Sequence, residues 1–263
     1  MIGMGNMGQA VVKGILSAEI VPPENIYISN RTPGILNKYQ EKHGVNPVTN
    51  NEELIDECDV VIIGIKPQDF YDAIEPISSS FTDDQVLISL CAGLDTSSIR
   101  KVVGEVGSIV RVMPNTAARI GQAIVGYCTE KADSPVDDMI EALLSPLGEV
   151  VKLDEDEEFR AFTVGAGSGI GFVFELMLYW QDWLEQYGFS AEEAKLITVR
   201  TFKGASMLAE SEEGVSIQEL QNQVVSKKGV THSGLSSMRE TEIERSLRIS
   251  FEKAAMRDQE LSK

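Results

Sequence analysis

Three glycines at the start of the chain have the spacing of a phosphate-binding turn. Gly3, Gly5 and Gly8 form the pattern G-x-G-x-x-G, in which the backbone can approach a dinucleotide pyrophosphate and the next helix offers unpaired N–H groups. The pattern is meaningful only between a strand and a helix. Met1 and Ile2 alone precede it, fewer than the roughly five or six residues of an ordinary strand. The glycines therefore predict a nucleotide site only if the surrounding elements agree.

A second polar group lies about twenty residues further on, where such sites contact the adenosine ribose. An acidic residue there contacts the ribose hydroxyls of NAD, whereas an arginine pairs with the 2′-phosphate of NADP. The group here has no acidic residue and favours NADPH, with NADH also possible; the alternative is a solvated arginine at a strand–helix corner. We expect two sets of residues to bind the cofactor: Ile2, Gly3, Met4, Gly5, Asn6, Met7 and Gly8 in the turn, and Asn30, Arg31 and Thr32 in the second group.

The elements that must position these residues are alternating strands and helices. Short β-rich runs at 25–30, 59–65, 85–90, 107–113, 123–128 and 149–153 alternate with helical patterns at 8–18, 32–43, 51–57, 68–79, 96–103 and 135–146. Several strand runs are apolar without alternation, as in strands covered on both faces. This order predicts an α/β, Rossmann-type, doubly wound and mostly parallel sheet over residues 1–153.

From residue 154 the β-rich runs stop and long helical patterns follow. The run 172–188 is apolar around most of its circumference. Ser190, Ser216 and Thr241 each precede a glutamate by three residues, the pattern of a helix-capping box. We expect an all-α C-terminal domain over 154–263, with the apolar helix buried in the core and at a subunit interface.

Charge and cysteine usage narrow the function classes. The 263 residues include 41 acidic and 23 basic side chains, and a net charge of −18 disfavours nucleic acid and anionic membranes as partners. The three cysteines are far apart and only two histidines occur, so we expect neither a disulfide framework nor a metal site. No apolar stretch approaches the ~20 residues of a membrane span. We therefore expect a soluble, cytoplasmic protein.

Seven motifs together resemble the pyrroline-5-carboxylate reductase family. They are IGMGNMG (2–8), SNRT (29–32), IKPQ (65–68), SLCAGL (89–94), RVMPNTAARIG (111–121), VGAGSGIGFVF (164–174) and VVSKKGVTHSGL (224–235), in the family's order and at its spacing. The resemblance implies NAD(P)H-dependent reduction of the cyclic imine 1-pyrroline-5-carboxylate to L-proline. It also implies a Rossmann domain followed by a helical dimerisation domain, and a homodimer or a larger ring of dimers.

The resemblance assigns further cofactor residues to the ends of the strands. The nicotinamide would be lined by Ala92, Gly93, Met113, Pro114 and Asn115, with Ile65, Lys66 and Pro67 facing the cofactor and Asn51 near the adenosine. These assignments agree with the tendency of doubly wound sheets to bind ligands outside the carboxyl ends of their strands.

The resemblance also assigns Thr231 as the residue whose hydroxyl contacts the imine nitrogen, since a hydroxyl both donates and accepts. Backbone N–H groups of Gly229, Val230 and Thr231 would hold the substrate carboxylate at a helix start, with Ser168 and Ser226 as further contacts. Judged by residue type alone, Thr231 could equally cap that helix.

Two departures from the family's pattern leave alternatives open. Ile170, Gly171 and Phe172 stand where the family has Pro-Ala-Tyr, and Lys228 replaces a glycine. A related cyclic imine acid as substrate, or a non-catalytic NADPH-binding paralogue, are the alternatives. A β-hydroxyacid dehydrogenase is disfavoured because the helix 170–187 contains no lysine, and that family carries a catalytic lysine there.

Overall fold

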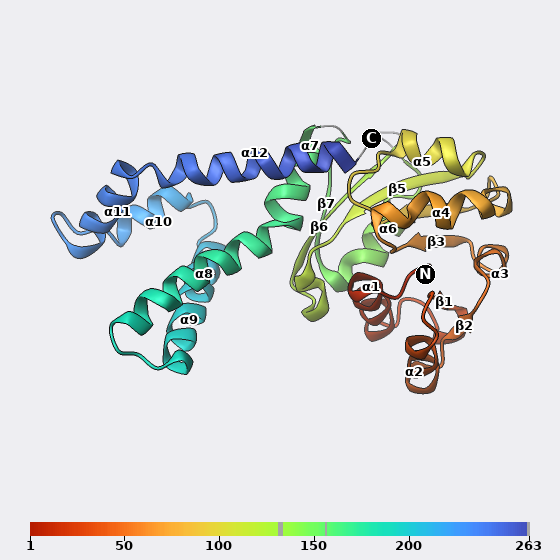
Figure 1. Ribbon diagram of the computed structural model, residues 1–263, viewed down its shortest axis with the longest axis horizontal. Helices are drawn as coiled ribbons and strands as arrows, with labels where there is room; N and C mark the ends of the chain where they lie inside the picture. Colours follow the sequence, from red (N-terminus) through yellow and green to blue (C-terminus); the bar gives the residue numbers. More distant parts are fainter. Residues whose placement is uncertain (131–133, 156, 262–263) are drawn as a thin grey trace. The chain divides into compact units, whose positions relative to one another are not determined.

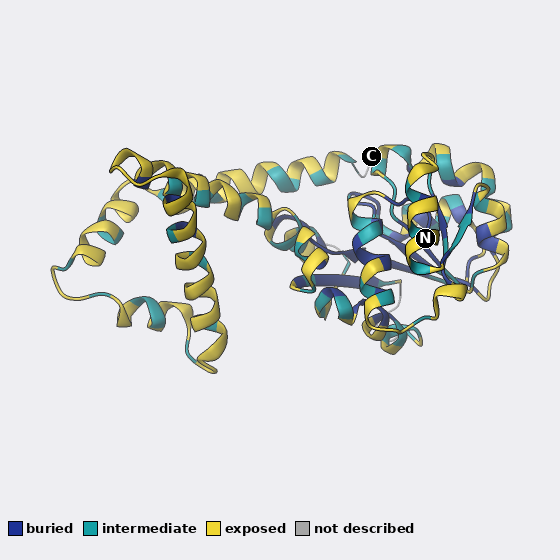
Figure 2. Cartoon of the chain, turned by 90° about the horizontal axis from the view of Figure 1, so that it is seen from below, coloured by how far each residue is buried: buried dark blue, intermediate teal, exposed yellow. Residues whose placement is uncertain are grey.

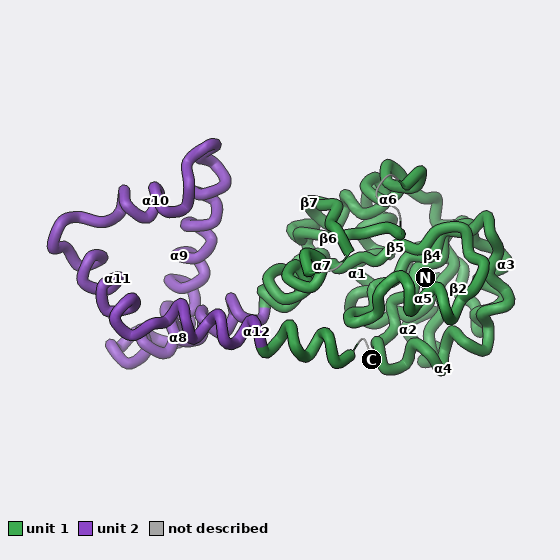
Figure 3. The backbone as a smooth tube through the Cα atoms, turned by 90° about the horizontal axis from the view of Figure 1, so that it is seen from above, with its two compact units in different colours: residues 1–170, 253–263 green, residues 171–252 purple. Residues whose placement is uncertain are grey.

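The computed structural model describes residues 1–130, 134–155 and 157–261. The chain forms two compact units, one of Met1–Ile170 with Lys253–Lys263 and the other of Gly171–Glu252 (Figure 3). The predicted domain limits, 1–153 and 154–263, mark where strands give way to helices. The division into compact units does not test where the secondary structure changes, so the predicted domain limits stay a prediction.

The first unit contains a sheet with helices around it (Figure 1). Its strands are β1 (Tyr27–Ser29), β2 (Asn46–Val48), β3 (Val60–Ile63), β4 (Val86–Ser89), β5 (Ser108–Met113), β6 (Ala123–Thr129) and β7 (Gly148–Lys152). β1 pairs with β2, and the other five follow the order β3-β4-β5-β6-β7. Every pair is parallel except β5 with β6. The expected doubly wound, mostly parallel sheet is confirmed, and β2 is an addition that the sequence did not predict.

The first strand is reduced to one residue. Ile2 forms parallel bridges to Ser29 of β1 and Ile63 of β3, and so joins the two parts of the sheet. Its N–H donates to the Ile62 carbonyl and its carbonyl accepts from Gly64, both at 2.8 Å. The glycine turn therefore does follow a strand position that is hydrogen-bonded on both sides.

Helices pack on both faces of this sheet. They are α1 (Asn6–Ser17), α2 (Gly34–His43), α3 (Asn51–Asp56), α4 (Phe70–Ile74), α5 (Thr96–Val103), α6 (Asp137–Leu144) and α7 (Glu157–Phe162), with short 3₁₀ turns at Pro23–Asn25, Pro67–Asp69, Glu75–Ser80, Thr116–Ile120 and Ser145–Leu147. One apolar cluster includes Val11 and Tyr127, and a second includes Leu54 and Leu87. The apolar strand runs are thus explained by burial on both faces.

The second unit is helical. It contains α9 (Ala191–Ser211), α10 (Ile217–Gln223) and α11 (Val230–Glu240), and most of α8 (Gly169–Gln186), while α12 (Ile243–Leu261) begins in it and ends in the first unit. The capping boxes at Ser190 and Ser216 are confirmed. The one expected at Thr241 is wrong. Its hydroxyl donates 2.8 Å back to the Ser237 carbonyl and so serves the end of α11 instead.

The apolar helix α8 is exposed in the single chain, so its expected burial in the chain's own core is wrong, while its burial at a subunit interface stays a prediction (Figure 2). Leu184 is its only buried residue, whereas Trp183 is 56% exposed and Tyr187, directly after the helix, is 70% exposed. The helical run Glu157–Gln186 is also long and apolar enough to cross a membrane by length and composition, which corrects the expectation that no such stretch exists. The core helix of a soluble protein passes the same test. A large exposed apolar surface marks an interaction site.

Candidate functional site

A pocket of about 370 Å³ lies at the carboxyl ends of β1 and β3, where the strand order reverses. Its lining residues are Ile2, Gly3, Gly5, Ser29, Asn30, Arg31, Thr32, Thr49, Asn51, Gly64, Ile65, Lys66, Asp69 and Ala73. Doubly wound sheets bind their ligands at such a reversal. Nine of these residues are ones that the sequence analysis assigns to the cofactor: eight come from three separate motifs, and the ninth is Asn51.

Two of the three glycines in the turn are required by close backbone contacts, and the third leaves open space beside the turn. Gly3 has φ +97°, and a Cβ there would lie 2.8 Å from the Gly64 carbonyl oxygen. A Cβ on Gly8 would lie 2.1 Å from the Gly3 carbonyl oxygen, whereas one on Gly5 would meet nothing within 4 Å. Gly5 is also the N-cap of α1, and no described side chain caps this helix. The turn therefore presents open backbone and the first N–H groups of α1, an arrangement suited to a phosphate.

Asn30 holds the turn against the end of β1. Its Oδ1 accepts from the Met4 N–H at 3.1 Å, and its amide donates to the Thr32 carbonyl at 3.0 Å. The neighbouring Arg31 side chain is 88% exposed, and its guanidinium lies 3.7 Å from the Asp69 carboxylate. Exposed ion pairs of this kind contribute little, so the guanidinium is accessible to an anionic ligand.

Five lining residues were missed by sequence reasoning, namely Ser29, Thr49, Gly64, Asp69 and Ala73. Ser29 donates to Asn51 Oδ1 at 2.6 Å and so fixes the amide at the start of α3. Asp69 faces Arg31 across the pocket mouth. No spacing rule connects these pairs, because their contact depends on which strands become neighbours.

Several predicted cofactor residues lie outside this pocket. Met4 is 2% exposed and packs in the core, and Asn6, Met7, Gly8 and Pro67 also do not line it. The other predicted residues follow the ends of two neighbouring strands: Ala92 and Gly93 come after β4, Met113 is the last residue of β5, and Pro114 and Asn115 come after it. Their contact with a nicotinamide stays a prediction.

A π-helical segment, Thr163–Gly167, packs against the end of β5 and places Ser168 there. The Asn115 amide donates to the Ala166 carbonyl at 3.3 Å, and a Cβ on Gly167 would lie 3.2 Å from the Met113 sulfur. Ser168 follows directly and is exposed. The first unit thus brings one predicted substrate residue close to the residues assigned to the nicotinamide. Segments of π-helix are frequent at functional sites.

The predicted substrate loop begins α11 in the second unit. Gly229 is the N-cap without a capping side chain, and Val230 and Thr231 are exposed at the helix start. Thr231 is therefore not the cap. A Cβ on Gly229 would lie 2.0 Å from Ser226 Oγ and 3.1 Å from the Ser226 carbonyl oxygen, so a side chain here would displace the Ser226 hydroxyl. Lys228 has φ +60°, a left-handed conformation that favours glycine, the residue it replaces in the family's pattern.

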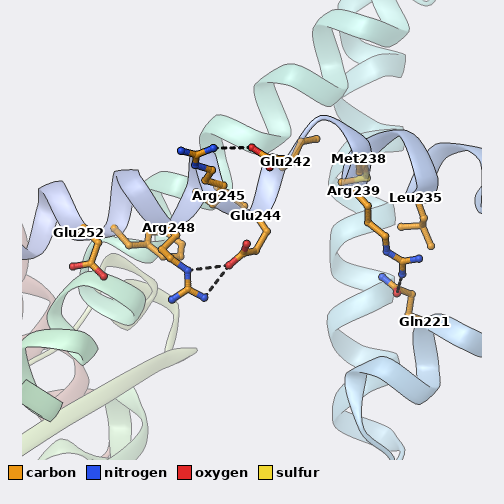
Figure 4. Close-up of a pocket in the computed structure, with 12 residues that line it drawn as sticks. Gln221, Leu235, Met238, Arg239, Glu242, Glu244, Arg245, Arg248 and Glu252 are labelled. Atoms are coloured by element: carbon orange, nitrogen blue, oxygen red, sulfur yellow. Dashed lines mark hydrogen bonds and ion pairs between the residues drawn. The ribbon is translucent and has the colours of Figure 1, made fainter.

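A second hollow, of about 890 Å³, lies among α10, α11 and α12 of the second unit (Figure 4). Glutamate–arginine pairs border it, with Arg245 at 3.0 Å from Glu242 and Arg248 at 2.8 Å from Glu244. None of the predicted cofactor or substrate residues lines it. Within the described part of the chain, no three His, Cys, Asp or Glu side chains gather as a metal site would need.

Comparison with known proteins identifies the family. Residues 156–261 match the family model for pyrroline-5-carboxylate reductase dimerisation, and residues 1–93 match that for coenzyme F420-dependent NADP oxidoreductase. Pyrroline-5-carboxylate reductase 2 of Bacillus subtilis is 31% identical, over 99% of this chain and 93% of the relative. The pyrroline-5-carboxylate reductase of Methanosarcina acetivorans is 32% identical, over 100% of this chain and 97% of the relative. The chain belongs to the pyrroline-5-carboxylate reductase family.

Solved reductase structures have the same fold. The pyrroline-5-carboxylate reductase of Coxiella burnetii has a TM-score of 0.90 at 28% identity, covering 100% of this chain and 97% of that one. The Plasmodium falciparum pyrroline carboxylate reductase with NADP bound has a TM-score of 0.88 at 25% identity, with the same coverage. The resemblance read from the motifs is confirmed, and so is the fold of a Rossmann-type domain followed by a helical one.

Proposed function

We propose that this chain reduces 1-pyrroline-5-carboxylate to L-proline with NADPH. The observation that carries the proposal is the pocket at the strand-order reversal. Its glycine turn, its uncapped helix start and its exposed arginine match a 2′-phosphorylated dinucleotide, in a chain that belongs to this reductase family over its whole length. The NADP in the Plasmodium falciparum relative supports the same cofactor class.

Different residues of the first unit would bind the different parts of NADPH. The N–H groups at the start of α1, behind Gly5, would hold the pyrophosphate. Arg31 would pair with the 2′-phosphate through charge-assisted hydrogen bonds, and Asn51 would contact the adenosine side. Bound NADPH supplies the hydride. The chain itself has only to bind, orient and exclude water.

The substrate needs two further functions from the protein. Reduction places a hydride on the imine carbon and a proton on the nitrogen, so a hydrogen-bonding group at that nitrogen assists the step. We assign this to the Thr231 hydroxyl, which is exposed and does not cap its helix. The Gly229 N–H donates to the Ser226 carbonyl at 2.9 Å, so the N–H groups of Val230 and Thr231 at the uncapped start of α11 would bind the carboxylate, with Ser168 and Ser226 as further contacts.

The working form that we propose is a homodimer, or a ring of dimers, joined through the helical unit. The matched dimerisation model covers this region, and α8 exposes a surface rich in aromatic side chains. The net charge of −18 disfavours binding to nucleic acid or anionic lipid. We place the enzyme in the cytoplasm.

The test is turnover of purified protein with NADPH and pyrroline-5-carboxylate, measured as loss of NADPH absorbance and formation of proline. Thr231→Ala should lower kcat/KM about 10- to 100-fold, the loss of one hydrogen bond to a charged group. Thr231→Ser should retain most of the activity, and Ser233→Ala, on the same exposed helix, is the matched control. NADPH binding without turnover would instead favour the non-catalytic paralogue. Faster reduction of a six-membered cyclic imine acid would shift the substrate.

A further inference from the structure

A buried arginine lies beneath the loop that follows β4. Arg111 of β5 is 7% exposed, and its Nη1 lies 3.2 Å from the Glu155 carboxylate. The guanidinium carbon lies 4.1 Å from the centroid of the Phe159 ring. An arginine so deeply enclosed is stable only with close charged and aromatic partners. The proposed cofactor and substrate contacts do not use it.

Glu155 connects this arginine to one end of the loop. Its two carboxylate oxygens accept from the Thr96 N–H at 2.7 Å and from the Thr96 hydroxyl at 2.5 Å. Thr96 is 5% exposed and begins α5. Because hydrogen bonds to charged acceptors are the strong ones, the carboxylate fixes the C-terminal end of the loop.

Asp258 near the end of α12 connects the arginine to the middle of the loop. Its carboxyl accepts from the Gly93 backbone and faces the guanidinium groups of Arg111 and Arg160. Burial raises the pKa of this carboxyl, while these three neighbours act in the opposite direction.

The end of α12 also packs closely on the loop. Gly93 has φ +79°, and a Cβ there would lie 2.7 Å from the Leu261 Cβ. The C-terminal end of α12 lies near α5 in two views (Figures 1 and 3).

We propose that Arg111, through Glu155 and Asp258, positions the loop 91–96 against the nicotinamide, so that the end of α12 is a working part of the cofactor site. Ala92 and Gly93 of this loop are the residues assigned to the nicotinamide, and the inference rests on that part of the proposed function. Two carboxylates from segments far apart in the sequence hold two points of one loop. Arg111 forms an ion pair with one of them, Glu155, and attracts the other, Asp258, electrostatically. Arg111, Glu155 and Asp258 are positioning residues.

The consequence is a selective effect on hydride transfer. We call the contacts that Arg111, Glu155 and Asp258 make around the loop 91–96 the loop clamp. The pyrophosphate and the 2′-phosphate are proposed to bind at Gly5 and Arg31, away from this loop, so the affinity for NADPH should depend little on the loop clamp. Donor–acceptor geometry should depend on it strongly, since a displacement of about 1 Å can cost roughly a hundredfold in rate.

The test compares Asp258→Asn with Glu260→Gln, the same change two residues along α12 at an exposed carboxylate. In the full-length protein, Asp258→Asn should speed hydrogen exchange at the 91–96 amides and lower kcat about 10-fold or more. The dissociation constant of NADPH should change less than about 3-fold. The primary kinetic isotope effect on kcat, measured with NADPH deuterated at the nicotinamide C4, should differ from that of the parent protein. Asp258→Glu should restore part of kcat, and Glu260→Gln should behave as the parent.

A purely structural role for the cluster predicts a lower melting temperature with an unchanged isotope effect, and that result would overturn the inference. Unchanged exchange at 91–96 would overturn it as well. If Asp258→Asn does not fold, Glu155→Gln is measured in the same way, because it weakens the hydrogen bonds that hold Thr96 at the other end of the loop. Hydrogen exchange needs no turnover. Altered exchange in a chain that does not reduce pyrroline-5-carboxylate would therefore contradict the proposed function and leave the loop clamp intact.

Discussion

Replacing Arg31 with alanine tests the cofactor preference at a single side chain. The guanidinium is 88% exposed and its one ion pair, with Asp69, spans 3.7 Å. Losing that pair should change the free energy of unfolding by less than about 1 kcal/mol. A charge-assisted hydrogen bond to the 2′-phosphate is worth about 1.5–3 kcal/mol, so Arg31→Ala should raise the KM for NADPH about 10- to 150-fold. NADH lacks this phosphate, so its KM should stay within about 2-fold.

The ion pair between Arg31 and Asp69 allows a second test of the proposed contact with the 2′-phosphate. In Arg31→Ala the Asp69 carboxylate remains beside the 2′-phosphate without its partner, and like charges repel. Arg31→Ala with Asp69→Ala should therefore recover part of the NADPH affinity. Lys101→Ala removes an exposed positive charge from α5, outside the pocket, and is the control. The assay is steady-state kinetics with both cofactors. An equal loss with NADPH and NADH, or a parent enzyme that prefers NADH, would refute the reasoning.

Three other predictions follow from backbone strain and burial. Gly3→Ala should lower the free energy of unfolding by about 1–3 kcal/mol in denaturant titration, because a Cβ at φ +97° would meet the backbone at 2.8 Å; an unchanged midpoint would speak against this turn. Lys228→Gly should raise that free energy by up to about 1 kcal/mol by relieving a left-handed lysine, and a decrease would contradict the strain. Burial raises the pKa of Cys91 to about 11 and of Cys128 to about 12, so at neutral pH both stay thiols. Mass spectrometry should find them alkylated only after unfolding, and rapid labelling of the native protein would show that they are accessible.

Local patterns in the sequence predicted the elements of the first unit well, because apolar runs and helix starts are encoded within a few neighbouring residues. The strand β2 was not predicted because its three residues include Pro47, and a proline argues against a strand inside a sheet. Thr241 matched a capping pattern, yet its hydroxyl serves the preceding helix, since the pattern does not say which helix end lies nearby. Parts of the site were predictable for the same local reason, including the glycine turn and Arg31.

Contacts between distant segments could not be predicted. Asp69 reaches Arg31, and Glu155 reaches Arg111, only because particular strands and loops become neighbours in the folded sheet. The contact between Asp258 and Gly93 joins the end of α12 to the loop that follows β4, which is far away in the sequence. The burial of α8 in the chain's own core was wrongly expected, because periodicity shows that a face is apolar and does not show whether the chain itself or a partner covers it.

The position of the bound dinucleotide is tested most directly by a crystal structure of the protein with NADP⁺. We predict the pyrophosphate against Gly5 and the start of α1, and the 2′-phosphate within hydrogen-bonding distance of Arg31. A nucleotide bound elsewhere on the chain, or a 2′-phosphate directed into solvent away from Arg31, would contradict it.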